Sequence, residues 1–260
     1  MKVLLPTFCV MLAITSIVMG NIHWKGKISE ASISEPATKN PQVETSKASP
    51  HREDLIKYIG NWPKESQELY KQRLSEGKPF KLLLVGSNSL GNETYNLPDD
   101  LADQLDTTYG DTVQVDGLIY DLMSSQFVLQ NKQEDLIEAK ADLILLEPFT
   151  IKDNGNVPID ESLANITSII KDVTSDRKET QFMLQPPNPL YKATYYPNQV
   201  KELEKYAKVN KIPYLNHWSN WPDLSSENMK DVLNEDRELP NENGYKIWSL
   251  YLEEFFVKQP

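Results

Sequence analysis

The sequence is poor in the residues that build disulfides and metal clusters. It has one cysteine, Cys9, among 260 residues, so no internal disulfide can form and no cysteine-rich zinc site is available. Its formal net charge of −11 leaves no general surplus of lysine and arginine for phosphate contacts. We therefore expect no metal and no cofactor, and neither nucleic acid nor anionic lipid as the main partner of the folded part. A small or neutral substrate suits this composition better.

Long apolar runs are absent after the first 24 residues. Within residues 1–24, Lys2 is followed by no charged residue until Lys25, which predicts a signal peptide or a membrane anchor, and both readings stay open. Residues 25–52 are rich in Ser, Glu, Lys, Thr and Pro and have no aromatic residue, so they predict a disordered stalk. We expect a membrane-anchored or secreted protein whose folded part lies outside the cytoplasm.

The rest of the chain carries regular apolar patterns. Residues 53–77 have helical spacing broken by Gly60 and Pro63, which predicts a helical lead-in. From residue 78 to 257, helical patterns alternate with five short apolar runs, at residues 81–85, 112–115, 142–146, 181–184 and 212–215. This alternation predicts the α/β class, with a three-layer α/β/α sandwich around a five-stranded parallel sheet. A ligand site is expected beyond the carboxyl ends of the strands.

Two segments that follow predicted strands, "GSNSLG" (86–91) and "DGLIY" (116–120), and one that precedes the final helical pattern, "DRELPNENGY" (236–245), carry recognisable motifs. With these motifs, residues 78–257 resemble the SGNH or GDSL hydrolases, a superfamily of esterases, lipases and carbohydrate acetyl-esterases. Three further stretches, "LLEPFTIKDNG", "LQPPNPLYKATYYP" and "HWSNWPD", are similar to secreted or membrane-anchored SGNH-type proteins of Gram-positive bacteria related to Bacillus. The resemblance implies a flavodoxin-like SGNH hydrolase fold and ester hydrolysis without a cofactor.

The sequence departs from the family pattern at two chemical positions. Asn88 stands where the family has its nucleophilic serine, between Ser87 and Ser89, and Leu239 stands where the family has its catalytic histidine. The neighbours of the second position are retained, namely Asp236, Pro240, Asn241 and Gly244. We interpret Leu239 as a core side chain whose truncation would cost stability.

Serine catalysis needs a base, and His217 is the only histidine within the predicted domain. The predicted catalytic set is therefore Ser87 or Ser89 as nucleophile, His217 as base and Asp236 as the group that orients it. Each has a structural alternative. The serines would cap a turn, His217 would pack between two tryptophans of "HWSNW", and Asp236 would cap its loop.

The resemblance also implies groups around the reaction. Gly117 matches the glycine that supplies a backbone N–H to the oxyanion hole, and Asn154 would complete the hole if its loop bends back. Asn88, Asn188 and Tyr191 are predicted to bind substrate, the last two within a rigid, proline-rich aromatic segment suited to stacking on a sugar.

Three functions stay open. The first is an SGNH-type esterase acting on an envelope or extracellular ester, such as an O-acetyl group of a glycan. The second is a catalytically inactive SGNH-fold binding module of the cell envelope, and the third is an acyltransferase. The expected partners are a small-molecule or glycan ester and, through the N-terminal segment, a membrane; the oligomeric state stays open.

Overall fold

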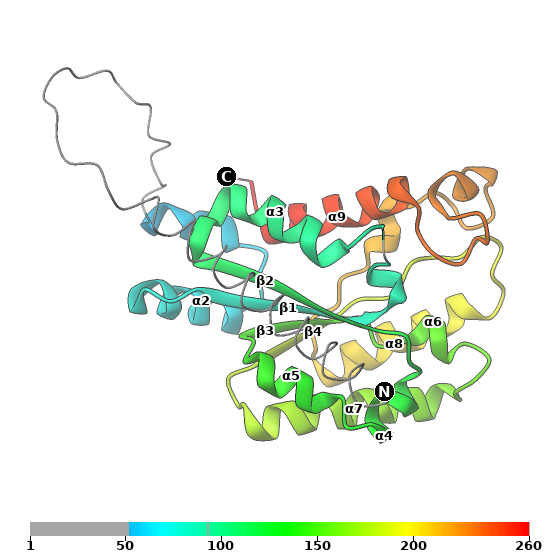
Figure 1. The fold of residues 1–260 in the computed structure, drawn as a ribbon, viewed down its shortest axis with the longest axis horizontal. Helices are drawn as coiled ribbons and strands as arrows, with labels where there is room; N and C mark the ends of the chain where they lie inside the picture. The colour runs from blue at the N-terminus through cyan, green and yellow to red at the C-terminus, as the bar shows by residue number, and fades with distance from the viewer. Residues whose placement is uncertain (1–51, 93, 260) are drawn as a thin grey trace, which may run out of the picture. The chain divides into compact units, whose positions relative to one another are not determined.

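The computed structural model describes residues 52–92 and 94–259 (Figure 1). The predictions for residues 1–24 and for nearly all of residues 25–52 lie outside the described residues. Within the described ranges, no helix combines the length and the apolar character that a bilayer crossing needs. All of these residues belong to one unit of the chain, residues 49–260.

Four parallel strands form the central sheet, in the order β2-β1-β3-β4. They are β1 (Phe80–Ser87), β2 (Val113–Tyr120), β3 (Leu143–Leu146) and β4 (Gln181–Leu184). Leu84 of β1 lies opposite Gly117 of β2 and Leu145 of β3, and Leu145 lies opposite Met183 of β4. The predicted α/β fold with a parallel sheet is confirmed, but the described sheet has four strands where five were expected.

The predicted fifth strand, residues 212–215, is reduced to a single parallel bridge between Leu184 and Tyr214. At this bridge the Leu184 N–H donates to the Pro213 carbonyl and the Leu215 N–H donates to the Leu184 carbonyl, both at 2.8 Å. Continuing the ladder in either direction would need an N–H from Pro213 or from Pro186. Because proline has no N–H, the pairing stops after one bridge.

Helices cover both faces of the sheet (Figure 1). One face carries α2 (Lys64–Glu76), α3 (Leu97–Tyr109) and α9 (Glu242–Phe256), and the other carries α4 (Ser124–Leu129), α5 (Gln133–Ala139), α7 (Ile159–Asp176) and α8 (Tyr196–Asn210). The short helices are η1 (Arg52–Ile59), η2 (Asn88–Leu90), η3 (Gly110–Thr112), α6 (Thr150–Asp153), η4 (His217–Asn220) and η5 (Glu227–Val232). The result is the three-layer sandwich that the sequence predicts.

Side-chain alternation along β1 divides the apolar core in two. Leu82 and Leu84 join the cluster beneath α2, α3 and α9, whereas Leu83 and Val85 join the cluster beneath α5, α7 and α8. Because successive side chains of a strand point to opposite faces, a fully apolar strand is buried on both sides. This explains why the central strands read as continuous apolar runs.

The predicted lead-in packs into the first of these clusters. Trp62 lies 5.0 Å from Phe80 and 5.7 Å from Phe256 between ring centroids, and its Nε1 donates to the Phe256 carbonyl at 2.8 Å. Nearby, the Lys258 N–H donates to the Tyr58 carbonyl at 2.8 Å. The lead-in therefore closes the amino edge of the sheet against the end of α9.

Candidate functional site

A cavity of about 240 Å³ opens at the carboxyl edge of the sheet. Asn88 follows β1 directly, and α6 brings a second part of the wall from the segment after β3. The lining residues are Asn88, Ile151, Lys152, Asn154, Leu190, Glu238 and Leu239. Parallel α/β proteins bind their ligands at this edge, so the cavity is the candidate functional site.

The cavity brings together the two positions at which the sequence departs from the family pattern. Asn88 and Leu239 both line it, and they supply an amide and an apolar side chain in place of a nucleophile and a base. Leu239 is half-buried and belongs to neither hydrophobic cluster. Its interpretation as a core residue is therefore wrong: it forms part of a cavity wall.

The two candidate serines lie beside Asn88 but are themselves fully buried. The Ser87 Oγ accepts a hydrogen bond from the Ser89 N–H at 3.2 Å and caps the short helix η2. The Ser89 hydroxyl is buried without a partner among the described residues. Ser87 therefore caps the turn in this structure, its role as nucleophile stays a prediction, and neither serine lines the cavity.

His217 is fully buried and cannot serve as the predicted base. Its ring lies flat against Trp248, and both ring nitrogens have hydrogen-bond partners. Nδ1 accepts from the Trp221 Nε1 at 3.0 Å, which leaves Nε2 to donate to the Pro186 carbonyl at 2.8 Å. Burial lowers the pKa of His217 to about 3, so the ring stays neutral near pH 7. Asp236 is exposed and makes no hydrogen bond or ion pair with any described residue, so it does not orient this histidine.

The structure gives "HWSNW" and "QPPNP" a shared structural role. Pro186 breaks the ladder of the fifth strand, and the His217 ring supplies the hydrogen bond that its carbonyl would have received from a strand partner. The next carbonyl, that of Pro187, accepts from the Trp218 Nε1 at 2.7 Å. Buried carbonyls need partners, and these two side chains provide them.

Gly117 does not lie in a turn at the cavity. It is in the middle of β2, opposite Leu84, and a Cβ at this position would lie 2.5 Å from Cγ of Pro98 in α3. The predicted strand at 112–115 is longer than expected, because β2 continues to Tyr120. The glycine is therefore explained by the close approach of α3 to β2, and Gly117 does not line the cavity. Its oxyanion-hole role stays a prediction that this position does not support.

Asn154 is half-buried and lines the cavity with Asn88, as its predicted role requires, and that role stays a prediction. Asn188 is fully buried, and its Nδ2 donates to the Glu238 carbonyl at 3.1 Å, so it holds the segment that carries Leu239.

Tyr191 donates its hydroxyl hydrogen to Glu227 and its ring is flanked by three cations, so its position favours a structural contact over sugar stacking. These cations are Lys192, Lys230 and Arg237, at 4.8, 4.9 and 5.4 Å from the ring centroid.

Glu147 is a titratable group that the sequence reasoning missed. It follows β3 and is fully buried, and its Oε2 accepts from the Ser87 N–H at 2.7 Å. A Cβ on Gly86 would lie 2.8 Å from the same oxygen, so glycine leaves the space for this carboxyl. Burial raises the pKa of Glu147 to about 7, although contacts from Ser87 oppose the rise. The single charge that directly follows the apolar run "LILL" is the signal that would have found it.

The retained part of the final block has an architectural explanation. The Asn241 side chain caps α9 by accepting from the backbone N–H groups of Asn243 and Gly244, at 2.9 and 3.2 Å. A Cβ on Gly244 would lie 2.2 Å from the Val232 carbonyl oxygen. Asn241 and Gly244 are therefore required by the start of the last helix. No group of His, Cys, Asp and Glu side chains suited to a metal occurs among residues 52–92 and 94–259.

Comparison with known proteins shows likeness in fold only. No family model matches the sequence, and no curated protein matches it. A peptidoglycan O-acetylesterase superposes with a TM-score of 0.60 at 10% identity, over 73% of this chain and 94% of that chain. An acetylxylan esterase from Geobacillus stearothermophilus superposes with a TM-score of 0.52 at 16% identity, over 69% of this chain and 95% of that chain. A lipolytic protein of the G-D-S-L family from Desulfitobacterium hafniense superposes with a TM-score of 0.53 at 17% identity, over 67% of this chain and 98% of that chain. The described part of this chain therefore has the α/β/α fold of the GDSL lipases and acetylesterases.

Proposed function

We propose that this protein is an SGNH-type esterase that takes an ester-bearing ligand into the cavity beside Asn88. The observation that carries the proposal is a serine next to a buried carboxyl group at the carboxyl edge of the sheet, namely Ser87 and Glu147. The fold likeness to an acetylxylan esterase and a peptidoglycan O-acetylesterase supports an ester as substrate. The polar and apolar cavity wall suits an acylated sugar.

Hydrolysis through this pair would not need a histidine. A carboxylate whose pKa is about 7 can accept a proton near neutral pH, which is the property a general base requires. The Ser87 oxygen would bond to the acyl carbon while its proton passes to Glu147, and the departing alcohol would take that proton. Water would then release the acyl group from Ser87 by the same exchange. Because Ser87 is fully buried and does not line the cavity, neighbouring side chains have to move before an ester can reach it.

The test is hydrolysis of p-nitrophenyl acetate and acetylated xylo-oligosaccharides by the purified full-length protein. We expect Ser87→Ala and Glu147→Gln each to lower kcat/KM at least 100-fold, since each removes one member of the pair. Ser89→Ala is the matched control, because its hydroxyl has no partner among the described residues, and it should retain full activity. The rate should rise as the pH rises through about 7, and Glu147→Gln should remove that rise. Turnover that survives Ser87→Ala would eliminate this mechanism.

A second candidate function is binding of an acylated ligand without turnover. The observation that favours it is that Asn88 and Leu239, which line the cavity, stand where the resemblance places the nucleophile and the base. Asn88→Ala separates the two functions. If Asn88 only blocks the path to Ser87, kcat should rise; if Asn88 is a binding group, calorimetry should show weaker binding of an acetylated oligosaccharide in the absence of any turnover.

We further propose that the protein works outside the cytoplasm of a Gram-positive bacterium, attached by residues 1–24. The charge-free apolar run and the polar composition of residues 25–52 support this location. Intact cells treated with an added protease should lose the folded part, and fractionation should place the full-length chain with membranes. Recovery of a full-length, protease-protected form in the cytosolic fraction would contradict the location.

A further inference from the structure

A second cavity, of about 440 Å³, lies at the opposite edge of the sheet, where the strands begin. Its lining residues are Arg73, Lys78, Pro79, Lys81, Lys140, Asp142 and Arg177. Five of these seven side chains are cationic in a chain whose net charge is −11. A strand of eight residues such as β1 spans roughly 25 Å, so this cavity is separate from the one beside Asn88.

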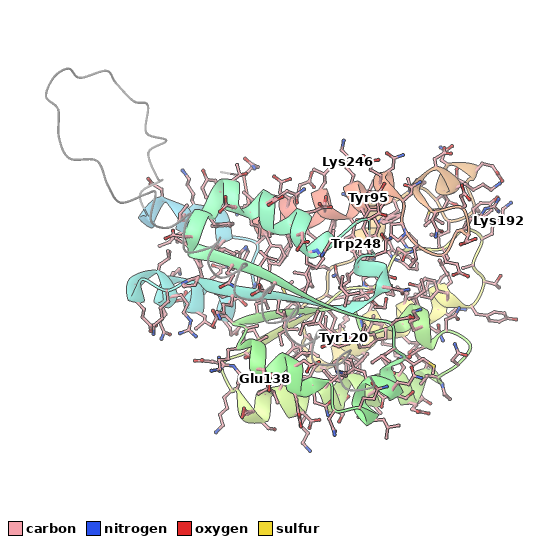
Figure 2. The ribbon with its side chains drawn as sticks, in the orientation of Figure 1. Tyr95, Tyr120, Glu138, Lys192, Lys246 and Trp248 are labelled. Atoms are coloured by element: carbon pink, nitrogen blue, oxygen red, sulfur yellow. The ribbon has the colours of Figure 1, made fainter. Side chains whose placement is uncertain are left out.

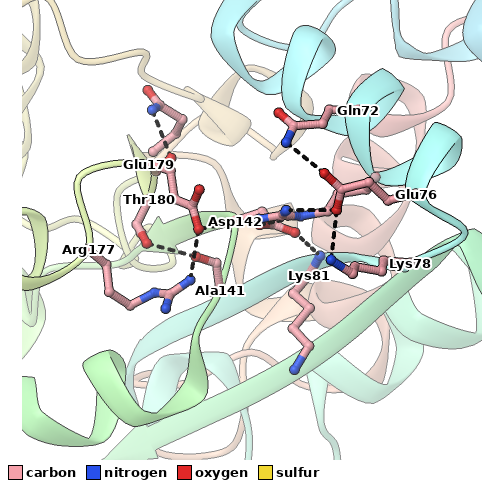
Figure 3. A network of polar contacts seen from close by, with 11 residues as sticks. Gln72, Glu76, Lys78, Lys81, Ala141, Asp142, Arg177, Glu179 and Thr180 are labelled. Carbon is pink, nitrogen blue, oxygen red and sulfur yellow. Dashed lines mark hydrogen bonds and ion pairs between the residues drawn. The ribbon is translucent and has the colours of Figure 1, made fainter.

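The floor of the second cavity is a fixed, buried ion pair. The Asp142 Oδ1 accepts from the Arg73 Nε and Nη2 at 3.1 and 2.7 Å. The Asp142 Oδ2 accepts from the Lys81 N–H at 2.9 Å (Figure 3). Only 3% of the Asp142 side chain is exposed. The hydrogen bond to Asp142 raises the pKa of Arg73, so this cation is permanent. The pair explains Arg73 and Asp142 as parts of the fold, but it does not explain the other cations.

The remaining positive charge is not neutralised by the described residues. Glu76 pairs with Arg73 and Lys78 at 3.5 and 2.9 Å, and Glu179 pairs with Arg73 and Arg177 at 3.4 and 3.3 Å. Five cations against these two carboxylates and Asp142 leave an excess of two positive charges.

Three donors stay free among the described residues. The amines of Lys81 and Lys140 have no hydrogen-bond or ion-pair partner, and the Arg177 Nε is buried without a partner. Figure 3 shows Asp142 lying between Arg177 on one side and Lys78 and Lys81 on the other.

We propose that this cavity binds a phosphate-class oxyanion with two negative charges, such as a phosphate monoester. A dianion matches the excess of two charges, whereas a single carboxylate would leave one cation uncompensated. Charge-assisted hydrogen bonds from ammonium and guanidinium groups are the usual means of holding such an anion. A buried N–H without a partner is destabilising, so an anion that accepts from the Arg177 Nε also satisfies that group. The site does not depend on the esterase proposed above.

The test is calorimetric titration of the full-length protein with inorganic phosphate and with glycerol phosphate, at ionic strength held constant with sodium chloride. We expect saturable binding that the double variant Lys81→Gln/Lys140→Asn weakens at least tenfold. Neither amine has a partner to lose, and asparagine tolerates the left-handed backbone of residue 140, where φ is 53°. Lys246→Gln is the matched control, because Lys246 projects from α9 into solvent (Figure 2) and does not line this cavity. This variant should bind phosphate as the wild type does.

Two results would overturn the proposal. One is the absence of saturable binding of either anion, and the other is an equal loss of affinity in the double variant and in the Lys246 control. A parallel sedimentation with vesicles that contain phosphatidic acid, a lipid whose headgroup is a phosphate monoester, identifies the source of the phosphate. Cosedimentation that the double variant abolishes would support the site and assign it to a lipid headgroup, whereas binding of the free anions without cosedimentation would assign it to a soluble phosphate ester.

Discussion

The imidazole of His217 lies flat on the indole of Trp248, with ring centroids 4.1 Å apart and an angle of 9° between the ring planes. Together with the bonds to Pro186 and Trp221, this stacking makes the histidine part of the framework that joins α9 to the segment after β4. The only histidine of the predicted domain is thus committed to structure.

We expect His217→Ala to lower the free energy of unfolding by roughly 2–4 kcal/mol, because it removes the stacking and leaves a buried carbonyl and a buried indole N–H unpaired. Urea unfolding followed by tryptophan fluorescence measures this cost. Esterase activity per folded molecule should not change. A variant that is as stable as the wild type but inactive would show instead that His217 takes part in the reaction.

Glu147 and His217 should shift stability with pH in opposite directions. The folded-state pKa of Glu147, about 7, lies above its ordinary 4.5, so its contribution is complete below pH 4.5 and is lost as the pH rises through 7. The folded-state pKa of His217, about 3, lies below its ordinary 6.5, so its contribution is complete above pH 6.5 and is lost as the pH falls toward 3. Between pH 4.5 and pH 6.5, the changes that the two groups make in the free energy of unfolding should largely cancel.

Substitutions at Glu147 and His217 separate the two contributions to the pH dependence of stability. Relative to wild type, Glu147→Gln should gain up to about 1.4 kcal/mol of stability for each pH unit between 4.5 and 7, and His217→Gln should gain as the pH falls from 6.5 toward 3. Denaturant unfolding at a series of pH values gives both differences. A stability difference that stays constant with pH would show that the carboxyl or the ring titrates in the folded state as it does in the unfolded chain.

Gly117→Ala should destabilise the fold by about 1–3 kcal/mol, because the added methyl carbon would lie 2.5 Å from Cγ of Pro98. Thermal or urea unfolding measures the loss, and Asp116→Ala, an exposed neighbour on the same strand, is the control that should change stability little. Activity per folded molecule should be retained. A large loss of activity in a stable Gly117→Ala protein would restore the oxyanion-hole interpretation.

Leu239→Ala should cost about 1 kcal/mol or less, because the side chain is half-buried at the wall of a cavity. Leu252→Ala, at a fully buried position of α9, should cost roughly 2–5 kcal/mol and provides the comparison. Equal losses in the two variants would place Leu239 in the core. The Leu239 variant should also bind bulkier ligands, since its cavity is larger.

The fold could be predicted because its signal is repeated along the chain. The β1 run is apolar at every position from Leu82 to Val85, as a strand buried on both faces requires, and the helices around it repeat apolar residues at helical spacing. The fifth strand could not be placed, because its length depends on whether the missing N–H groups of Pro186 and Pro213 fall on the paired side. That depends on the register, which the sequence does not reveal.

The sequence predicts the edge of the sheet at which the candidate site lies, but not the roles of the side chains around it. The carboxyl edge of the sheet follows from the strand pattern, and Asn88, Asn154 and Leu239 do meet there. The role of His217 could not be predicted, because it is decided by the Pro186 carbonyl, 31 residues away in the chain. Glu147 was missed for a similar reason, since its pKa depends on burial that only the assembled layers create.

The bond from the Lys258 N–H to the Tyr58 carbonyl places the two ends of the described unit side by side, next to Trp62 and the first residue of β1. The cavity beside Asn88 opens at the far edge of the sheet. A linker, fusion partner or solid support attached at either end of this unit would therefore leave the mouth of that cavity facing the solution. Immobilised protein should accept large polymeric ligands as readily as free protein does.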